Sequence, residues 1–183
     1  PEGASGMPGI IVPRKTVLEV HKLLEDADVT VKVELSASKI RFTVGDVVLT
    51  SQLIDGTFPD YGRVIPQNND KVLSISNAEF AHAVDLVSTL SSDKSRAVKL
   101  KVSDGKLVLS VNNPDSGSAT EELDADYSSD DLEIGFNARY LLDISGQLGS
   151  DRAEFLLSDA GSPTMVRDRE DASALYVLMP MRV

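Results

Sequence analysis

Hydrophobic and polar residues alternate with a period of two along much of this chain, and no other feature restricts its fold as strongly. In residues 29–35, three valines and a leucine alternate with threonine, lysine and glutamate. Residues 40–44, 98–102 and 107–111 follow the same pattern. An Asp-Gly pair at 104–105 is typical of a hairpin turn. Alternation of this kind predicts antiparallel strands, each with one buried and one hydrated face.

Apolar residues recur at helical spacing in three other parts of the chain. The predicted helices span about 13–24, 77–92 and 136–149. Pro13 suits the start of a helix, and Asn77 and Asn137 are of the type that caps a helix N-terminus. We expect each helix to pack its apolar stripe on a sheet.

The chain also contains an internal repeat. Moving residues 12–20 forward by 124 positions places them on 136–144, and basic, apolar and acidic positions then correspond through a whole helix. Each repeat reads strand, helix and three strands. One such half-unit precedes the polar segment 66–70 and two follow it, so the predicted domains are an incomplete one at 1–66 and a complete one at 67–183. The predicted fold class is α+β, with repeated β-α-β-β-β half-units whose helices lie on one face of antiparallel sheets.

The net charge of −11 argues against a protein that holds nucleic acid through phosphate contacts, since such domains usually carry a basic excess. The predicted helices differ from the rest of the chain, because their basic and acidic residues balance. The basic residues are Arg14, Lys15, Lys22 and Arg139, and the acidic ones are Glu19, Glu79, Asp85 and Asp143. A surface built from the helices would therefore repel DNA far less than the rest of the protein.

No residue pattern predicts catalysis. The two histidines, His21 and His82, fall on different predicted helices, and the sequence has no cysteine. The acidic cluster at 124–131 lacks the spacing of a calcium-binding loop, and the sequence has no phosphate-binding or zinc-binding motif. We expect a scaffold or binding protein that is not an enzyme and needs no cofactor or metal. The alternatives are a regulatory or enzymatic α+β domain unrelated to DNA and a direct nucleic-acid binder.

Two segments are too specific in composition to be ordinary loops. Residues 55–66 combine aromatic, proline, glycine and arginine residues, and residues 176–183 stay apolar almost to the last position. Their patterns, Asp-Gly-x-Phe-Pro-Asp-Tyr-x-Arg-Val-x-Pro and Tyr-Val-x-Met-Pro-Met-Arg, resemble the linker and the C-terminus of bacterial sliding clamps, the beta subunits of DNA polymerase III. Shorter segments at 11–15, 111–114 and 133–137 fit the same family in the expected order.

The resemblance covers essentially the whole chain and implies the sliding-clamp fold. In that family two subunits join head to tail in a homodimeric ring, whose helices line the hole and whose strands form the outer wall. Residues 1–66 would be the second half of the middle domain with its linker, and residues 67–183 the last domain. The implied function is that of a DNA polymerase processivity factor, a non-catalytic ring that encircles duplex DNA independently of sequence.

The resemblance also implies partners and a location. The partners would be the DNA polymerase III alpha subunit, the clamp loader, and other polymerases and repair proteins. The implied location is the bacterial cytoplasm, at the nucleoid, without membrane association.

Members of the family bind short apolar peptides in a pocket between the middle and last domains. The matching positions of this chain are Pro59, Arg63, Val64, Asn137, Tyr140, Gly161, Pro163, Val177, Leu178, Met179, Pro180, Met181 and Arg182. The positions implied to face DNA are Arg14, Lys15, His21, Lys22 and Arg139, and those implied at the subunit interface are Leu90 and Lys94. The other pocket wall comes from the first half of the middle domain, whose Thr-x-Gly-His/Tyr-Arg-Leu segment does not occur in this sequence. An apolar pocket around Tyr140 would favour peptide binding, whereas a cluster of polar side chains there would favour an enzyme.

Overall fold

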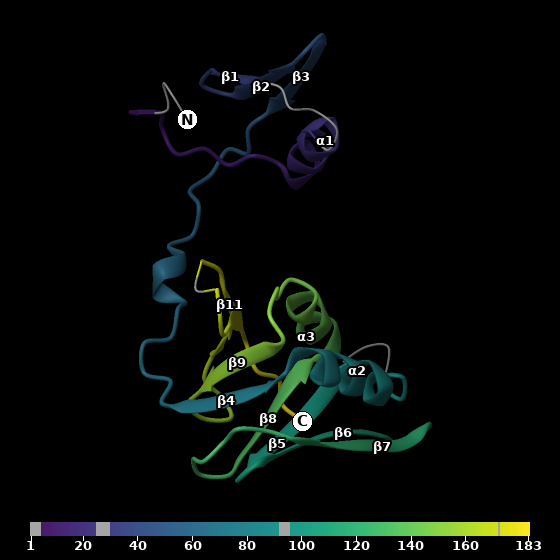
Figure 1. Cartoon of the computed structure of the whole chain (residues 1–183). Helices are drawn as coiled ribbons and strands as arrows, with labels where there is room; N and C mark the ends of the chain where they lie inside the picture. The colour runs from purple at the N-terminus through teal and green to yellow at the C-terminus, as the bar shows by residue number, and fades with distance from the viewer. Residues whose placement is uncertain (1–4, 25–29, 92–95, 172) are drawn as a thin grey trace. The chain divides into compact units, whose positions relative to one another are not determined.

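A computed structural model describes residues 5–24, 30–91, 96–171 and 173–183. The chain divides into two compact units, Pro1–Asp60 and Tyr61–Val183 (Figure 1). Within the described residues, every helix is too short or too polar to cross a membrane.

The described residues of the N-terminal unit form one helix and a three-stranded antiparallel sheet. Its elements are α1 (Arg14–Leu24), β1 (Val31–Leu35), β2 (Lys39–Val44) and β3 (Val47–Gln52), and the sheet order is β1-β2-β3. The predicted alternation is confirmed in β2, which buries Ile40 and Val44. The β2–β3 hairpin turns at Gly45, whose φ of 55° is one that glycine adopts without steric cost. Thr16 of α1 donates a hydrogen bond of 2.7 Å to Ser51 of β3 and so attaches the helix to the sheet.

The prediction of a strand before α1 is wrong for the described residues. The segment from 7 to 13 has no regular pairing, although the amide of Ile54 donates to the carbonyl of Ile11 at 2.9 Å. The reason lies in the repeat. In the C-terminal unit, the first strand of each half-unit pairs with the sheet of the other half-unit, and the N-terminal unit contains a single half-unit.

The C-terminal unit holds two half-units, as predicted. After a 3₁₀ turn, η1 (Tyr61–Arg63), the first comprises β4 (Lys71–Ser76), α2 (Asn77–Ser88), β5 (Ala97–Ser103), β6 (Lys106–Asn113) and β7 (Gly117–Asp124). The second comprises β8 (Leu132–Asn137), α3 (Ala138–Ser145), β9 (Arg152–Leu157), β10 (Thr164–Asp168) and β11 (Leu175–Leu178). Both follow the order strand, helix, three strands, so the predicted repeat is confirmed.

Each half-unit of the C-terminal unit contributes its first strand to the sheet of the other. β4 pairs with β9 and β8 pairs with β5, which produces two four-stranded sheets ordered β11-β10-β9-β4 and β7-β6-β5-β8. The two sheets join where Ser74 and Asp126 exchange backbone hydrogen bonds of 2.9 and 3.0 Å. Arg152 reinforces this junction, since its guanidinium donates to the Ser74 carbonyl at 2.9 Å and to the Asp126 carboxylate at 2.5 Å. Neither half-unit is therefore complete without the other.

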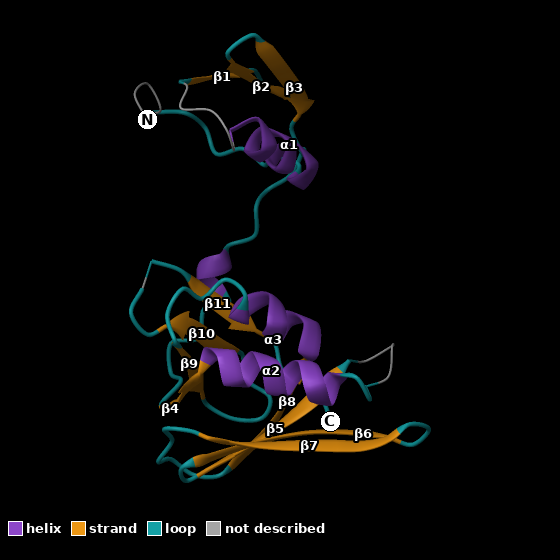
Figure 2. Cartoon of the chain, turned by 45° about the vertical axis from the view of Figure 1, so that its right-hand side comes forward, coloured by secondary structure: helices purple, strands orange, loops and turns teal. Residues whose placement is uncertain are grey.

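Helices α2 and α3 lie side by side over the strands, as expected (Figure 2). Asn137 caps α3 as predicted, because its side chain accepts a hydrogen bond of 2.9 Å from the Arg139 amide. The prediction that Asn77 caps α2 is wrong. Ser76 caps that helix, and the side chain of Asn77 donates to the carbonyl of Ser145 at 3.0 Å. Asn77 thus links the start of one helix to the end of the other.

Both helices end earlier than predicted. In α2 the hydroxyls of Ser88 and Thr89 donate to carbonyls three residues back, which a further helical turn would have used. This helix ends at Ser88 and not near 92, a position outside the described residues. In α3 the amide of Gln147 donates at 2.8 Å to the carbonyl of Ile144, three residues back, and the helix ends at Ser145 instead of near 149.

The hydrophobic core of the C-terminal unit lies between its helices and sheets. Phe80 of α2 is completely buried, and its ring meets Phe155 of β9 edge to face with centroids 5.1 Å apart. Leu141 of α3 is 1% exposed, whereas Val17, at the matching position of α1, is 54% exposed. The predicted packing of the α1 stripe therefore holds only in part. Leu141 belongs to a core that also contains residues of the second helix, α2, whereas the described residues of the N-terminal unit form only one α-helix.

Candidate functional site

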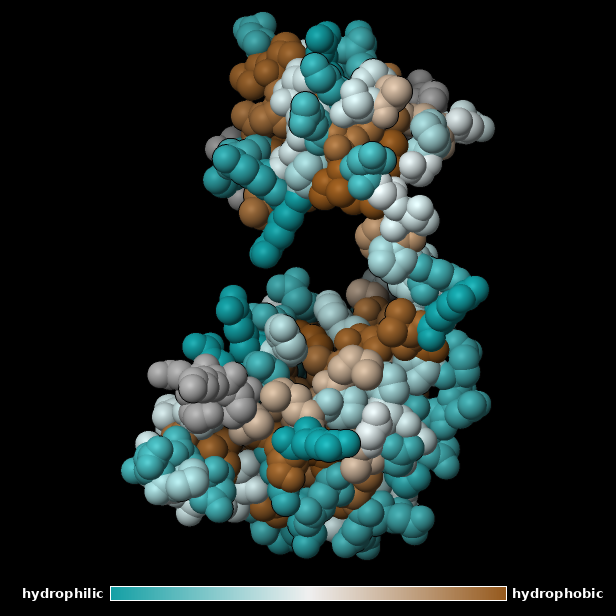
Figure 3. Space-filling view, turned by 180° about the vertical axis from the view of Figure 1, so that it is seen from behind, coloured by the Kyte–Doolittle hydropathy of each residue, from teal (hydrophilic) through white to brown (hydrophobic). Residues whose placement is uncertain are grey.

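An apolar groove of about 550 Å³ is lined by residues of α3 and β11 in the C-terminal unit (Figure 3 shows the hydropathy of one face). We call it the α3–β11 groove, and its residues are Tyr140, Asp143, Ile144, Leu175, Tyr176, Val177, Leu178 and Met179. Tyr140 is 58% exposed and Met179 is 60% exposed, so large parts of both side chains face solvent. Such apolar side chains, with few polar groups among them, suit the apolar side chains of a ligand.

The two walls of the groove come from different elements. On α3, Tyr140 and Ile144 stand four residues apart and so share one helix face. On β11, the pairing with β10 places Leu178 opposite Thr164, and Leu178 is buried. Met179 follows the last paired residue and remains exposed. Regular secondary structure therefore positions both walls.

The structure brings some of the predicted pocket residues together and separates others. Tyr140, Val177, Leu178 and Met179 meet in the α3–β11 groove. Gly161, Pro180, Met181 and Arg182 line a second depression of about 590 Å³, which we call the β8 depression because Glu133, Ile134 and Gly135 of β8 form part of its wall. The chain passes from one to the other between Met179 and Pro180.

The remaining predicted pocket residues are not among the lining residues of either hollow. Arg63 ends turn η1, and Val64 follows it, exposed. Asn137 is the cap of α3, and Pro59 belongs to the N-terminal unit. Pro163 precedes β10, and its carbonyl accepts a hydrogen bond of 2.9 Å from Asn69.

Sequence reasoning missed four residues of the groove, namely Asp143, Ile144, Leu175 and Tyr176. The helical spacing assigns Ile144 only to the core-facing stripe of its helix. Tyr176 begins the apolar C-terminal run and Leu175 directly precedes it, so that run could have indicated both residues. Asp143 has no such signal in the sequence.

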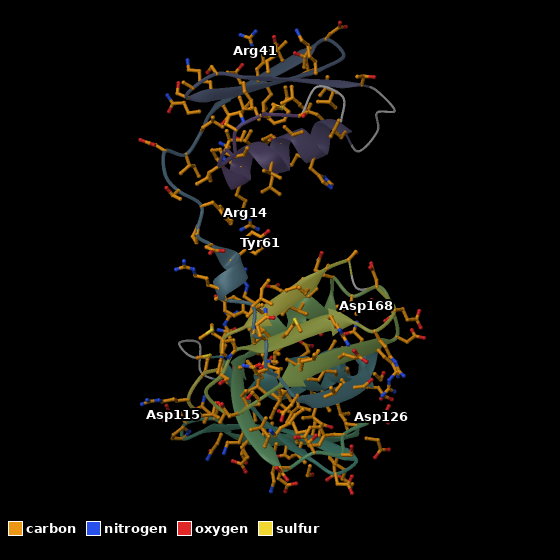
Figure 4. The ribbon with its side chains drawn as sticks, turned by 90° about the vertical axis from the view of Figure 1, so that its left-hand side faces the viewer. Arg14, Arg41, Tyr61, Asp115, Asp126 and Asp168 are labelled. Atoms are coloured by element: carbon orange, nitrogen blue, oxygen red, sulfur yellow. The ribbon has the colours of Figure 1, made fainter. Side chains whose placement is uncertain are left out.

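Asp168, which is labelled in Figure 4, lies at the end of β10 and accepts hydrogen bonds from several donors. One carboxylate oxygen accepts from the amides of Gly149 and Ser150 at 2.9 and 2.8 Å. The other accepts from the Ser150 hydroxyl at 2.5 Å and from the Glu170 amide at 2.8 Å. These donors hold the pKa of Asp168 well below its usual range, and the Ser150 hydroxyl contributes most, before the amides of Glu170 and Ser150. This carboxylate ties the loop after α3 to the residues that follow β10, which connect β10 to β11.

Replacing Asp168 with asparagine is expected to lower the melting temperature of the protein by several degrees at pH 7, because an amide nitrogen cannot accept the donors around it. A carboxyl group whose pKa is depressed in the fold stabilises the fold fully above the ordinary value of 3.8, and this stabilisation is lost gradually as the pH falls from that value through the folded pKa. Thermal denaturation should therefore separate the two proteins fully at pH 7 and still in large part at pH 3, and the difference should disappear only as the pH falls through the folded pKa. Asp115→Asn, on an exposed turn, is the control. Equal melting temperatures at pH 7 would contradict this role.

The residues predicted to face DNA are all exposed on helices. Arg14, Lys15, His21 and Lys22 lie on α1, and Arg139 lies on α3, where its guanidinium is 3.9 Å from the Asp143 carboxylate. Every charged residue assigned to a predicted helix lies within the observed bounds of α1, α2 or α3. The equality of basic and acidic residues on the helices therefore holds in the structure.

Of the two predicted interface residues, Leu90 lies just after α2. It is half-buried, and its carbonyl accepts a hydrogen bond of 3.0 Å from the Asn113 side chain. Lys94 lies outside the described residues.

His21 and His82 belong to different units. Across the part of the chain that the structure describes, histidine and carboxylate side chains form no group of three or more that could hold a metal ion.

Sequence families match both units of the chain. Residues 62–182 match the family described as "DNA polymerase III beta subunit, C-terminal domain", and residues 2–60 match "DNA polymerase III beta subunit, central domain". The "Beta sliding clamp" of Caulobacter vibrioides is 53% identical over 100% of this chain and 49% of its own length. That of Escherichia coli is 41% identical over 95% of this chain and 48% of its own length. The chain thus spans about half the length of these relatives.

Solved structures agree with these matches. The sliding clamp of Bartonella birtlesii bound to griselimycin superposes with a TM-score of 0.96 at 59% identity, over 100% of this chain and 50% of that one. The DNA polymerase III beta protein of Caulobacter crescentus superposes with a TM-score of 0.93 at 52% identity, over 100% of this chain and 49% of that one. At these identities and TM-scores the likeness extends to the whole fold of the chain.

Proposed function

Because this chain belongs to the family of DNA polymerase III beta subunits, the bacterial sliding clamps, we propose that it is part of a polymerase processivity factor. The whole protein is a non-catalytic ring that encircles duplex DNA and tethers the replicative polymerase to it. The observation that carries this function is the apolar α3–β11 groove, since a tether needs a surface for partners and not a reaction centre.

The division of charge supports a ring that encloses DNA without gripping it. The helices carry as many basic as acidic residues, whereas the chain as a whole has a net charge of −11. We assign the lumen of the ring to the helices, with Arg14, Lys15, His21, Lys22 and Arg139 near the phosphates. Near-neutral helices permit sliding, and an acidic outer surface discourages nonspecific adhesion to DNA.

The partner site is a pocket for short apolar peptides. We assign to it the α3–β11 groove and the β8 depression, together with Pro59, Arg63, Val64, Asn137 and Pro163. The apolar residues around Tyr140 favour peptide binding over enzymatic chemistry, since Asp143 is the one charged residue among the described residues that line the groove. Its peptides come from the alpha subunit of DNA polymerase III, the clamp loader, other polymerases and repair proteins.

The half-units of this chain correspond to parts of the domains of the whole ring. Residues 1–66 form the second half of the middle domain with its linker, and residues 67–183 form the last domain. Two full-length subunits join head to tail, with Leu90 and Lys94 at the interface. The protein acts in the cytoplasm at the nucleoid.

A topological experiment tests this function. The full-length protein, loaded on circular DNA by its loader and washed in high salt, is expected to stay bound, because enclosure does not depend on phosphate contacts. Cutting the circle once should release it from the DNA ends. Gel filtration of labelled protein on intact and cut circles measures the retained fraction. Equal release from both DNAs would rule out an enclosing ring.

A further inference from the structure

The last residues of the chain cross β8 at a single glycine. The amide of Met181 donates a hydrogen bond of 2.8 Å to the carbonyl of Gly135, and the two residues form an isolated antiparallel bridge. Gly135 is buried in the middle of β8. The bridge therefore attaches Met181 to a strand that already pairs with β5.

This crossing requires that residue 135 have no side chain. A Cβ atom at Gly135 would lie 2.7 Å from the Met181 carbonyl oxygen and 2.8 Å from Cγ2 of Val183, with Cγ1 closer still. The backbone of Gly135 is not in the left-handed region, so the need is for space and not for conformational freedom. Because one of these atoms belongs to the backbone, a side-chain rotation alone cannot relieve the clash.

Strand β8 therefore contacts a segment connected to each wall of the α3–β11 groove. At its end, Asn137 caps α3, the helix that carries Tyr140. Two residues earlier, Gly135 holds Met181, which is two residues beyond Met179. We propose that Gly135 is a positioning residue of the peptide pocket, whose missing side chain keeps the C-terminal segment on β8 and so fixes Met179 in the groove. This inference rests on the proposed function.

The test compares full-length proteins by titration calorimetry, and the probe is a synthetic peptide with the last residues of the polymerase that the clamp tethers. Gly135→Ala is expected to raise the dissociation constant about tenfold, an effect similar to the loss of one anchoring residue at an interface. The exchange of the Met181 amide with deuterium should also accelerate, because its acceptor has moved. Gly146→Ala is the matched control, since a Cβ there would meet its nearest atom at an ordinary 3.5 Å.

Two more variants separate positioning from general damage. Met181→Pro removes the amide donor and leaves β8 intact, so it should weaken the peptide to a similar extent, even if Gly135→Ala does not fold. Adding Val183→Ala to Gly135→Ala removes the side-chain part of the clash and should recover part of the affinity.

Failure of the proposed function and failure of the proposed role of Gly135 give different results. If the unmodified protein binds no peptide, the proposed function fails and the inference fails with it. If the unmodified protein binds and both Gly135→Ala and Met181→Pro bind equally well, only the role of Gly135 is overturned. Weakened binding with faster exchange at Met181 supports it.

Discussion

Replacing Phe80 with alanine is expected to lower the free energy of unfolding of the C-terminal unit by about 3–5 kcal/mol, the usual cost of truncating a buried phenylalanine. Its ring is completely buried between α2 and the sheets and is packed edge to face on Phe155. Removal leaves a cavity that rigid strands on two sheets cannot close. Urea denaturation followed by circular dichroism measures the difference.

Leu86→Ala is the matched control for this prediction. Leu86 lies on the same helix but is 46% exposed, so its truncation should change the free energy of unfolding by less than about 1 kcal/mol. If both variants were destabilised to the same extent, α2 would not pack on the sheets through the face described.

Replacing Met179 with alanine in the full-length protein is expected to weaken binding of a polymerase peptide by about 1–2 kcal/mol, a value typical of a contact residue in an interface pocket. This corresponds to a dissociation constant about 5- to 30-fold higher. Met179 is the most exposed apolar residue of the α3–β11 groove, and its flexible thioether can adapt to different ligand side chains. Titration calorimetry with the peptide measures the change.

Two further variants test whether the loss of affinity is specific to the Met179 side chain. Met179→Leu keeps an apolar side chain of similar volume and should retain most of the affinity. Val72→Ala removes an exposed apolar side chain of β4, which does not line the groove, and should have no effect. An unchanged affinity of Met179→Ala would exclude this residue from the peptide site.

Local patterns in the sequence were sufficient for most of the elements and for their repetition, and the strand expected before α1 is the exception. The alternation in residues 40–44 and 107–111 predicted β2 and β6, because alternate side chains of a strand face opposite sides. The shift of 124 positions places Arg14 on Ala138, and these two residues begin α1 and α3. The family was recognisable from two segments, 55–66 and 176–183, which the two matched families cover in large part.

The ends of helices and the role of Asn77 required the structure. Both Ser76 and Asn77 are of a type that caps helices. Which of them caps α2 depends on which side chain has a better hydrogen-bond partner elsewhere. Asn77 finds the carbonyl of Ser145, a residue far away in the sequence, and Ser76 is left to cap the helix. Local preference cannot include a partner that only folding brings near.

The sequence by itself determined the half-unit, because strand alternation, helical spacing and turn residues act over a few neighbouring positions. Only the tertiary structure decided that β4 and β8 each join the sheet of the other half-unit. It also decided that Met181 crosses β8 at Gly135, in the β8 depression. Finally, it brought Met179 and Tyr140 into one groove. Residues 140 and 179 are distant along the chain, and their meeting depends on how two sheets and two helices pack. Glycine at 135 reads in sequence as an ordinary strand residue, and its necessity arises from the backbone of residue 181 lying 2.7 Å from where a Cβ would be.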